Sequence, residues 1–243
     1  MKFKFQDKTY KFPSSLSEIK LRQRIEFNNL YGKEILKRQE EIFEKDEEGN
    51  YKPKDQTEAV LHVMDVACKN FSFFSGIPLE DVQLIPIEQV MNVYHSCFDV
   101  ISKQENEMKF SQKHYFKNEL WTIESPEINY ESKMTFNEFI TAKQIVKTMA
   151  DLGEGQWEAL PSLCAIFLRK EDEAFDEKFI SGQTSRVQDM MDLPLDIALN
   201  VAFFLGISMI SYSKITRYSK NDLKEGMVPT WQTISTNGDG SVS

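Results

Sequence analysis

The strongest constraint on this fold is a sequence pattern that occurs twice along the chain. In each half, residues typical of a turn are followed later by residues typical of a helix start. Residues 84–93, LIPIEQVMNV, align without gaps with residues 192–201, DLPLDIALNV, so that Pro, Asn and Val coincide. In both segments an acidic residue follows the proline by two positions, which is favourable chemistry for the first turn of a helix. We therefore expect Pro86 and Pro194 to start equivalent helices.

A candidate β-hairpin comes well before each of these helices. In residues 3–12, aromatic side chains alternate with polar ones on either side of the turn Gln6-Asp7-Lys8, and residues 115–123 surround the polar turn Lys117-Asn118-Glu119 in a similar way. Alternation with a period of two around a short polar turn is typical of a hairpin. Pro13 and Pro126 follow the two segments. The two hairpins should therefore superpose.

Helices are expected between each hairpin and its proline-started helix. In the first half, the pattern predicts a helix from about Glu18 with Ser17 as N-cap, a break or kink at Gly32, and an amphipathic helix ending at Gly76. In the second half it predicts a helix from about Thr135 and an apolar helix over residues 157–168. Residues 44–56 are interpreted as an exposed loop, and residues 171–188 as irregular. The expected inward-facing residues are Ile19, Leu21, Ile25, Ile35, Leu36, Ile42, Phe43, Val60, Leu61, Val63, Met64, Ala67, Cys68, Phe71, Ile87, Val90, Met91, Tyr94, Phe98, Ile101, Phe136, Phe139 and Ile140.

These elements predict an α+β fold that is predominantly α-helical. It would have two similar halves, each a β-hairpin followed by about three helices. The first half would span residues 1–108 and the second residues 109–212, with a polar C-terminal tail over residues 213–243. A hydrophobic content of 41% is enough to bury a core. Whether the halves form one domain or two is left open.

Charge and hydropathy argue against several classes of function. The net charge of −9 disfavours direct nucleic-acid binding, because phosphate recognition normally needs a basic face. The first residues, MKFKF, lack the apolar segment that a secretory signal peptide contains, so we expect the chain not to be secreted. The longest apolar run, residues 197–210, is shorter than the roughly 20 residues that a membrane-spanning helix requires. We therefore expect neither a membrane span nor a membrane partner.

No residue pattern predicts a catalytic site, a cofactor site or a metal site. His62, His95 and His114 form no metal-type pair with one another. The three cysteines lie in apolar stretches and are interpreted as buried, inert free thiols (Cys68, Cys97 and Cys164). We expect a non-enzymatic protein that needs no cofactor. A cytoplasmic enzyme that uses a histidine or cysteine, with an unknown substrate, stays as an alternative.

Two apolar features point to protein partners. The C-terminal tail carries large apolar residues in a polar context, and these are the candidate partner-binding residues: Val228, Pro229, Trp231 and Ile234. They could pack onto their own domain or dock into a partner. The helix expected over residues 195–210 is apolar nearly all round, which favours burial in the core. The alternative is that it forms a subunit interface, which would make the protein a homo-oligomer.

Several short segments resemble acidic proteins of tailed bacteriophages. They are the MKFKF hairpin that ends at Pro13, the helix with Leu21 and Ile25, residues 134–140 (MTFNEFI), and residues 192–199 (DLPLDIAL) followed by FFL at residues 203–205. Proteins of this group are described as tail assembly chaperones or virion structural proteins. The chain departs from them in residues 44–56 and in its tail.

The resemblance implies a non-enzymatic assembly or virion protein that binds other phage structural proteins of the tail, neck or baseplate. Its place would be the host cytoplasm during assembly. In the alternative, it would be a ring or hub component of the virion whose C-terminal arm clasps a partner. No catalytic residue is implied in either case.

Overall fold

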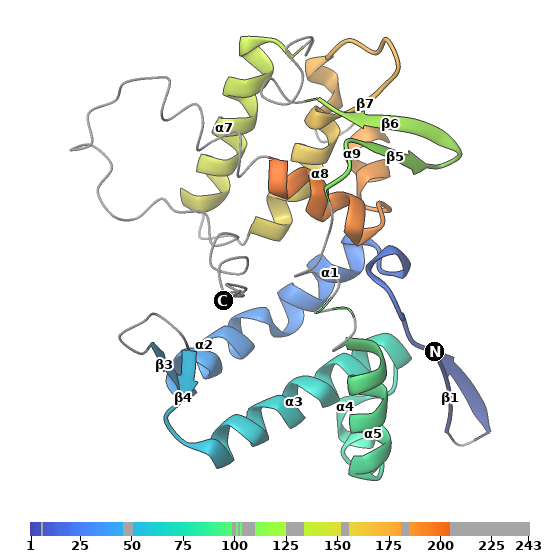
Figure 1. Cartoon of the computed structure of the whole chain (residues 1–243), viewed down its shortest axis with the longest axis vertical. Helices are drawn as coiled ribbons and strands as arrows, with labels where there is room; N and C mark the ends of the chain where they lie inside the picture. The colour runs from blue at the N-terminus through green and yellow to red at the C-terminus, as the bar shows by residue number, and fades with distance from the viewer. Residues whose placement is uncertain are drawn as a thin grey trace, which may run out of the picture. The chain divides into compact units, whose positions relative to one another are not determined.

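The computed structural model describes residues 1–5, 7–45, 51–98, 101, 103, 110–124, 134–151, 156–180 and 185–204. Within these residues the chain is mostly helical, with small antiparallel sheets, which confirms the predicted α+β class (Figure 1). The chain divides into two compact units. The first comprises Met1–Ile19 and Gln23–Glu107, and the second Lys20–Arg22 and Met108–Ser243.

The first unit begins with the predicted hairpin. Strands β1 (Lys2–Phe5) and β2 (Lys8–Lys11) pair antiparallel, with Phe3 opposite Tyr10. Asp7 in the turn has a φ of 61°, a left-handed conformation that Asp tolerates better than most residues. Phe3 packs edge-to-face on Phe71, with 5.2 Å between the ring centroids, so the hairpin contributes to the core of this unit.

The first long helix differs in detail from the prediction. Residues Leu16–Glu18 form a 3-10 turn, and α1 (Leu21–Phe27) begins three residues after Glu18, so the expected N-cap at Ser17 is wrong. Gly32 does not break the helix. It ends a π-helical turn (Asn28–Gly32) that joins α1 directly to α2 (Lys33–Ile42). Ile19, Leu21 and Ile25 are buried, as predicted, but Leu36 on α2 is exposed.

The charged segment after α2 contains a second hairpin. Strands β3 (Phe43–Lys45) and β4 (Tyr51–Pro53) pair antiparallel, so the prediction of an exposed loop over residues 44–56 is wrong where these strands lie. The two strands pair Phe43 with Pro53 and Lys45 with Tyr51, and their charged side chains stay on the surface. Apolar and polar residues hardly alternate in this segment. Such alternation arises when one face of a sheet is buried, and both faces of this two-stranded ribbon are largely exposed.

Helix α3 (Gln56–Ser75) ends at Gly76 as predicted, but its buried face differs from the predicted one. The Asp55 carboxylate caps its start by accepting from the Thr57 and Glu58 amides, and Gly76 ends it with a φ of 71°. Val60, Leu61 and Val63 are exposed, contrary to the prediction, whereas His62 and Lys69 are buried. Helix α2 packs against α3, and the buried Lys69 ammonium pairs with Glu34 of α2 at 2.9 Å.

Two shorter helices complete the first unit. Helix α4 (Leu79–Val82) is followed by α5 (Ile87–Val93), which starts at Pro86 as predicted, with the proline at the N-cap position. A π-helical turn (Tyr94–Phe98) extends α5. Ile87 is exposed, so its expected inward position is wrong; as the first residue of the helix it lies outside the face that carries Val90 and Val93.

The second unit contains a three-stranded antiparallel sheet in the order β5-β6-β7. Strands β5 (Lys113–Phe116) and β6 (Glu119–Ile123) form the second predicted hairpin, with Lys117 and Asn118 both at positive φ in its turn. Strand β7 (Leu168–Lys170) pairs with β6. Strand β7 was not predicted from the sequence, because it follows the preceding apolar helix without a turn signal.

Helices cover this sheet and supply most of the core of the second unit. They are α7 (Phe136–Asp151), α8 (Gln156–Phe167), a 3-10 turn (Glu177–Phe179), α9 (Ser185–Met190) and the helical residues 195–204. Helix α8 packs between α7 and α9 (Figure 1). The segment predicted as irregular, residues 171–188, thus contains the 3-10 turn and the first part of α9. Phe136, expected on the apolar side of its helix, is exposed.

Pro194 directly precedes the helical residues 195–204, as predicted. The segment before it holds residues Lys20–Arg22 in place. The Leu21 amide donates to the Leu193 carbonyl at 2.8 Å, and Asp192 forms ion pairs of 3.0 Å with both Lys20 and Arg22. That the halves superpose, with equivalent hairpins and proline-started helices, stays a prediction. None of the helices in the described ranges is long and apolar enough to cross a membrane.

Candidate functional site

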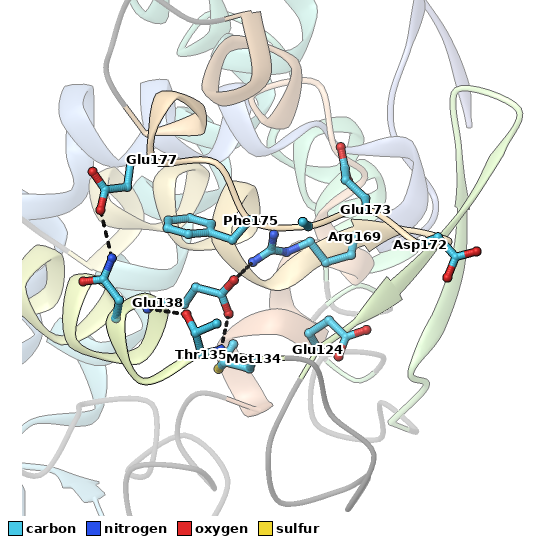
Figure 2. Close-up of a pocket in the computed structure, with 11 residues that line it drawn as sticks. Glu124, Met134, Thr135, Glu138, Arg169, Asp172, Glu173, Phe175 and Glu177 are labelled. Atoms are coloured by element: carbon cyan, nitrogen blue, oxygen red, sulfur yellow. Dashed lines mark hydrogen bonds and ion pairs between the residues drawn. The ribbon is translucent and has the colours of Figure 1, made fainter.

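A pocket of about 380 Å³ lies in the second unit, beside the start of α7 (Figure 2). It is formed by the residue after β6, the first turn of α7 and the segment from β7 to the 3-10 turn. Its walls combine apolar groups with carboxylates and a single guanidinium. The lining residues are Glu124, Met134, Thr135, Asn137, Glu138, Arg169, Asp172, Glu173, Ala174, Phe175 and Glu177.

The start of α7 fixes the floor of the pocket through a capping box. Thr135 and Glu138 are three residues apart, and each side chain bonds the other's backbone amide. The Glu138 carboxylate accepts from the Thr135 amide at 2.8 Å, and the Thr135 hydroxyl accepts from the Glu138 amide at 3.4 Å. Glu138 is therefore held rigidly although it is a buried acid, with only 2% of its surface exposed.

Arg169 of β7 meets this carboxylate inside the protein. Its Nη2 lies 3.1 Å from Glu138 Oε1, and its Nε donates to the Ile166 carbonyl at 2.8 Å. The guanidinium lies over the Phe175 ring, 5.0 Å from the centroid. Figure 2 draws both side chains. Burial lowers the pKa of Arg169, while the charge of Glu138 opposes that shift. The Arg169 Nη1 is buried and has no hydrogen-bond partner among the described residues.

A second buried arginine supports the wall of the pocket. Arg186 of α9 places Nη1 2.6 Å from Glu173 Oε1, donates through Nη2 to the Leu168 carbonyl, and lies 4.0 Å from the Phe179 ring centroid. Burial opposes the charged form of Glu173, but hydrogen bonds from Arg186 and the Lys170 amide outweigh it and lower the pKa of Glu173. Glu173 therefore stays ionised at neutral pH.

The rim of the pocket is acidic. The Asn137 amide group donates to Glu177 Oε1 at 2.8 Å, which orients that carboxylate, and Asp172 sits in a turn with a φ of 56°. The lining holds five carboxylates and one guanidinium, and two of these carboxylates, Glu138 and Glu173, are paired with Arg169 and Arg186. Phe136, beside the pocket, has 80% of its surface exposed. Such a site can bind a cationic or hydrogen-bonding group.

The candidate partner-binding residues of the tail lie outside the described residues. These are Val228, Pro229, Trp231 and Ile234. The apolar helix expected over residues 195–210 is described as far as residue 204, and most of its apolar residues up to that point are buried, although Phe203 is 47% exposed.

The histidines and cysteines lie away from this pocket's lining. His62 is buried on α3 and burial lowers its pKa, while His114 on β5 has Nε2 2.7 Å from the Ser111 carbonyl oxygen. Burial raises the pKa of all three thiols. Cys97 and Cys164 are buried as predicted, but Cys68 is only half-buried. Among the described residues, no group of three or more His, Cys, Asp or Glu could hold a metal ion.

None of the lining residues was predicted from the sequence as part of a pocket. The predicted helix start near Thr135 agrees with α7, and the spacing Thr135-x-x-Glu138 before an apolar run, a capping-box signature, could also have linked the Glu138 carboxylate to that start. Arg169 directly after the apolar run 163–168 could have indicated a buried charge that requires a partner. Nothing in the sequence indicates that these two residues meet. Comparison with protein-family models, curated proteins and solved structures found no match for this chain.

Proposed function

We propose that this chain is a non-enzymatic assembly or virion protein of a tailed phage that acts by binding other tail, neck or baseplate proteins. The proposal that the chain binds another protein is supported by the pocket at the start of α7 and by Phe136, which is exposed next to it in the sequence. An exposed aromatic anchor next to a pocket rich in hydrogen-bonding groups is typical of a surface that binds another protein. The phage context rests on the resemblance of the short segments quoted above.

Two further observations support this proposal. The net charge of −9 favours a basic protein partner over nucleic acid. The thiols of Cys97 and Cys164 are buried and have raised pKa values, so they are poor nucleophiles in the folded state. A cytoplasmic enzyme that uses one of these residues is therefore the weaker proposal.

The test is deletion of the gene from a phage genome that encodes the chain, combined with mass spectrometry of purified particles. We expect deletion to abolish infectious particles and to leave incomplete tails or unattached heads and tails. An assembly factor would be absent from wild-type particles, whereas a ring or hub component would be present in several copies. Normal yields of infectious particles after deletion would contradict both forms of the proposal.

A matched variant connects the phenotype to the surface. Phe136→Ser removes the exposed aromatic ring, whereas Tyr115→Ser removes an aromatic ring that is 77% exposed on β5. We expect the first substitution to reduce the yield of infectious particles and the second to leave it close to wild type. The reverse order would show that the surface beside α7 is not the binding surface.

A further inference from the structure

We propose that His62 makes the first unit sensitive to acid. When the ring of His62 takes up a proton, the segment formed by α2 and the strands β3 and β4 (the α2–hairpin segment) moves away from α3. The proposal concerns a conformational property of the first unit and is independent of the proposed phage function.

His62 lies in the interior, where the α2–hairpin segment packs on α3. This segment leads from α2 to the start of α3 (Figure 1), and both α2 and β4 contact α3. Only 8% of the surface of His62 is exposed. Its ring lies 6.5 Å, between centroids, from the ring of Phe43 on β3, and Ile42 at the end of α2 is buried. Full exposure of the His62 ring therefore requires the α2–hairpin segment to move.

The hydrogen bonding of the His62 ring favours its neutral form. Nδ1 of His62 is buried and has no hydrogen-bond partner among the described residues. A neutral imidazole can leave this nitrogen as a lone pair, whereas the charged ring carries an N–H group at both nitrogens. A buried N–H group without an acceptor and a buried charge without a partner are both unfavourable. Protonation therefore favours a conformation in which water reaches Nδ1.

The charges nearest to His62 do not offset this cost. Arg38 of α2 and Lys69 of α3 oppose a positive ring, while Asp65 favours it. The Asp65 carboxylate already binds the Lys69 ammonium at 2.6 Å, and Arg38 pairs with Glu58. Burial has the largest effect, and it lowers the pKa of His62 below the ordinary value of 6.5.

Other charged groups around α3 are paired elsewhere, exposed, or on its other side. On the α2–hairpin segment, most pair with neighbours and two are exposed: Glu34 with Lys69, Glu41 with Lys37 and Arg38, Glu44 with Lys52, Lys45 over the Tyr51 ring, and the exposed Lys33 and Glu40. The remaining elements that contact α3 pack near Phe71, which is nine residues from His62 and so on the opposite side of the helix. They carry Lys8, Lys11, Glu80, Asp81, Glu88 and His95.

The direction of the pH effect follows from the lowered pKa. Once the α2–hairpin segment has opened, His62 is solvated and titrates near its ordinary pKa of 6.5. A pKa that is lower in the closed form stabilises that form above about pH 6.5, and this contribution is lost as the pH falls through the lowered value. The open form should therefore become more populated in mild acid, by up to about tenfold per pH unit between the two pKa values.

The test is hydrogen–deuterium exchange of the full-length protein, measured by mass spectrometry in the wild type and in His62→Gln. Glutamine is polar and does not titrate. Comparing the two proteins at one pH removes the intrinsic pH dependence of exchange. We expect the ratio of wild-type to variant exchange rates in the α2–hairpin segment to rise about 3–10-fold between about pH 7.5 and about pH 5.5. An unchanged ratio would overturn the inference, and so would an equal rise throughout the second unit.

His114→Gln is the matched control. His114 lies on β5 in the second unit, and burial lowers its pKa as well. This variant should keep the wild-type pH dependence of exchange in the α2–hairpin segment. Loss of that dependence in His114→Gln would show that His62 is not the responsible group, which would also overturn the inference.

A titration of the wild type by NMR covers the case in which His62→Gln does not fold. The histidine Cε1–Hε1 signals report the protonation of each ring, and the His62 signal is the one that persists in both His95→Gln and His114→Gln. We expect its midpoint to lie below 6.5. A midpoint at or above this value would overturn the inference, because the folded first unit would then tolerate the charged ring.

Discussion

Arg169 and Glu138 form an ion pair of 3.1 Å in which the two side chains are only 4% and 3% exposed. The pair joins strand β7 to the first turn of α7 within the second unit. Moving both charges out of water is costly, so such a pair contributes little net stability compared with an apolar contact of the same shape. Removing one partner alone is different, because the remaining charge stays buried without compensation.

We therefore expect Arg169→Met to lower the free energy of unfolding of the second unit by about 3–5 kcal/mol. Urea unfolding followed by tryptophan fluorescence measures this, because Trp121, Trp157 and Trp231 all fall in the sequence of that unit. Adding Glu138→Leu to Arg169→Met should restore much of the loss. A single variant as stable as the wild type would contradict the buried pair.

The matched control is Lys170→Met, one residue further along β7. Lys170 pairs with Glu119 at 2.7 Å, but the two side chains are 42% and 49% exposed. Exposed pairs contribute about 0–1 kcal/mol. A loss after Lys170→Met as large as that after Arg169→Met would show that burial does not explain the difference.

Because of Lys69, we expect the first unit to lose stability at alkaline pH. Its ammonium is buried, 2.6 Å from Asp65 and 2.9 Å from Glu34. Burial acts to lower the pKa of Lys69, but the hydrogen bonds and charges of the two acids outweigh burial, and the pKa is raised. A raised pKa in the folded state stabilises the protein below the unfolded value of about 10.4, and this contribution disappears as the pH rises through the folded value.

We expect Lys69→Met to cost about 1–3 kcal/mol near pH 8, since hydrogen bonds to charged groups contribute that much. The difference between wild type and variant should shrink as the pH rises above about 10.4, the ordinary pKa of lysine, and through the raised pKa of Lys69. Urea unfolding followed by far-UV circular dichroism at each pH gives both quantities. A difference that stays constant over this range would show that the charge of Lys69 does not stabilise the fold.

The cysteines predict an order of alkylation. The thiolate is the reactive form, and burial raises the pKa of Cys68, Cys97 and Cys164. Cys68 is half-buried and the other two are buried. Iodoacetamide should modify Cys68 first in the native protein, with all three at least about tenfold slower than in urea. Peptide mass spectrometry over time measures this, and rapid labelling of Cys164 in the folded protein would contradict its burial.

The elements with strong local signals were predictable from the sequence. The hairpin turns at Asp7 and Lys117-Asn118, the end of α3 at Gly76 and the starts after Pro86 and Pro194 depend on residues close together in the chain, and each is present. The inward face of a helix was less predictable. Val60, Leu61 and Phe136 are exposed because neighbouring elements decide which side of a helix is covered.

The pocket could not be predicted, because it depends on contacts between distant residues. Glu138 and Arg169 are 31 positions apart, and Arg186 reaches Glu173 from another helix. A single sequence shows each of these residues only as one charge among many, since charged residues make up 28% of the chain. The capping box at Thr135 was the one local signal, and it marks a helix start without indicating what lies opposite.

Gly76 offers a test of the C-terminal end of α3. Its φ of 71° is disfavoured for residues with a Cβ, yet a Cβ added there would meet no atom within 4 Å. Gly76→Ala should therefore destabilise the first unit through backbone strain alone, by about 1–2 kcal/mol. Gly76→Asn should cost less, because Asn is the next most common residue at this helix-end position. Thermal unfolding followed by circular dichroism compares the two variants. An Asn variant less stable than the Ala variant would indicate a steric conflict in place of strain.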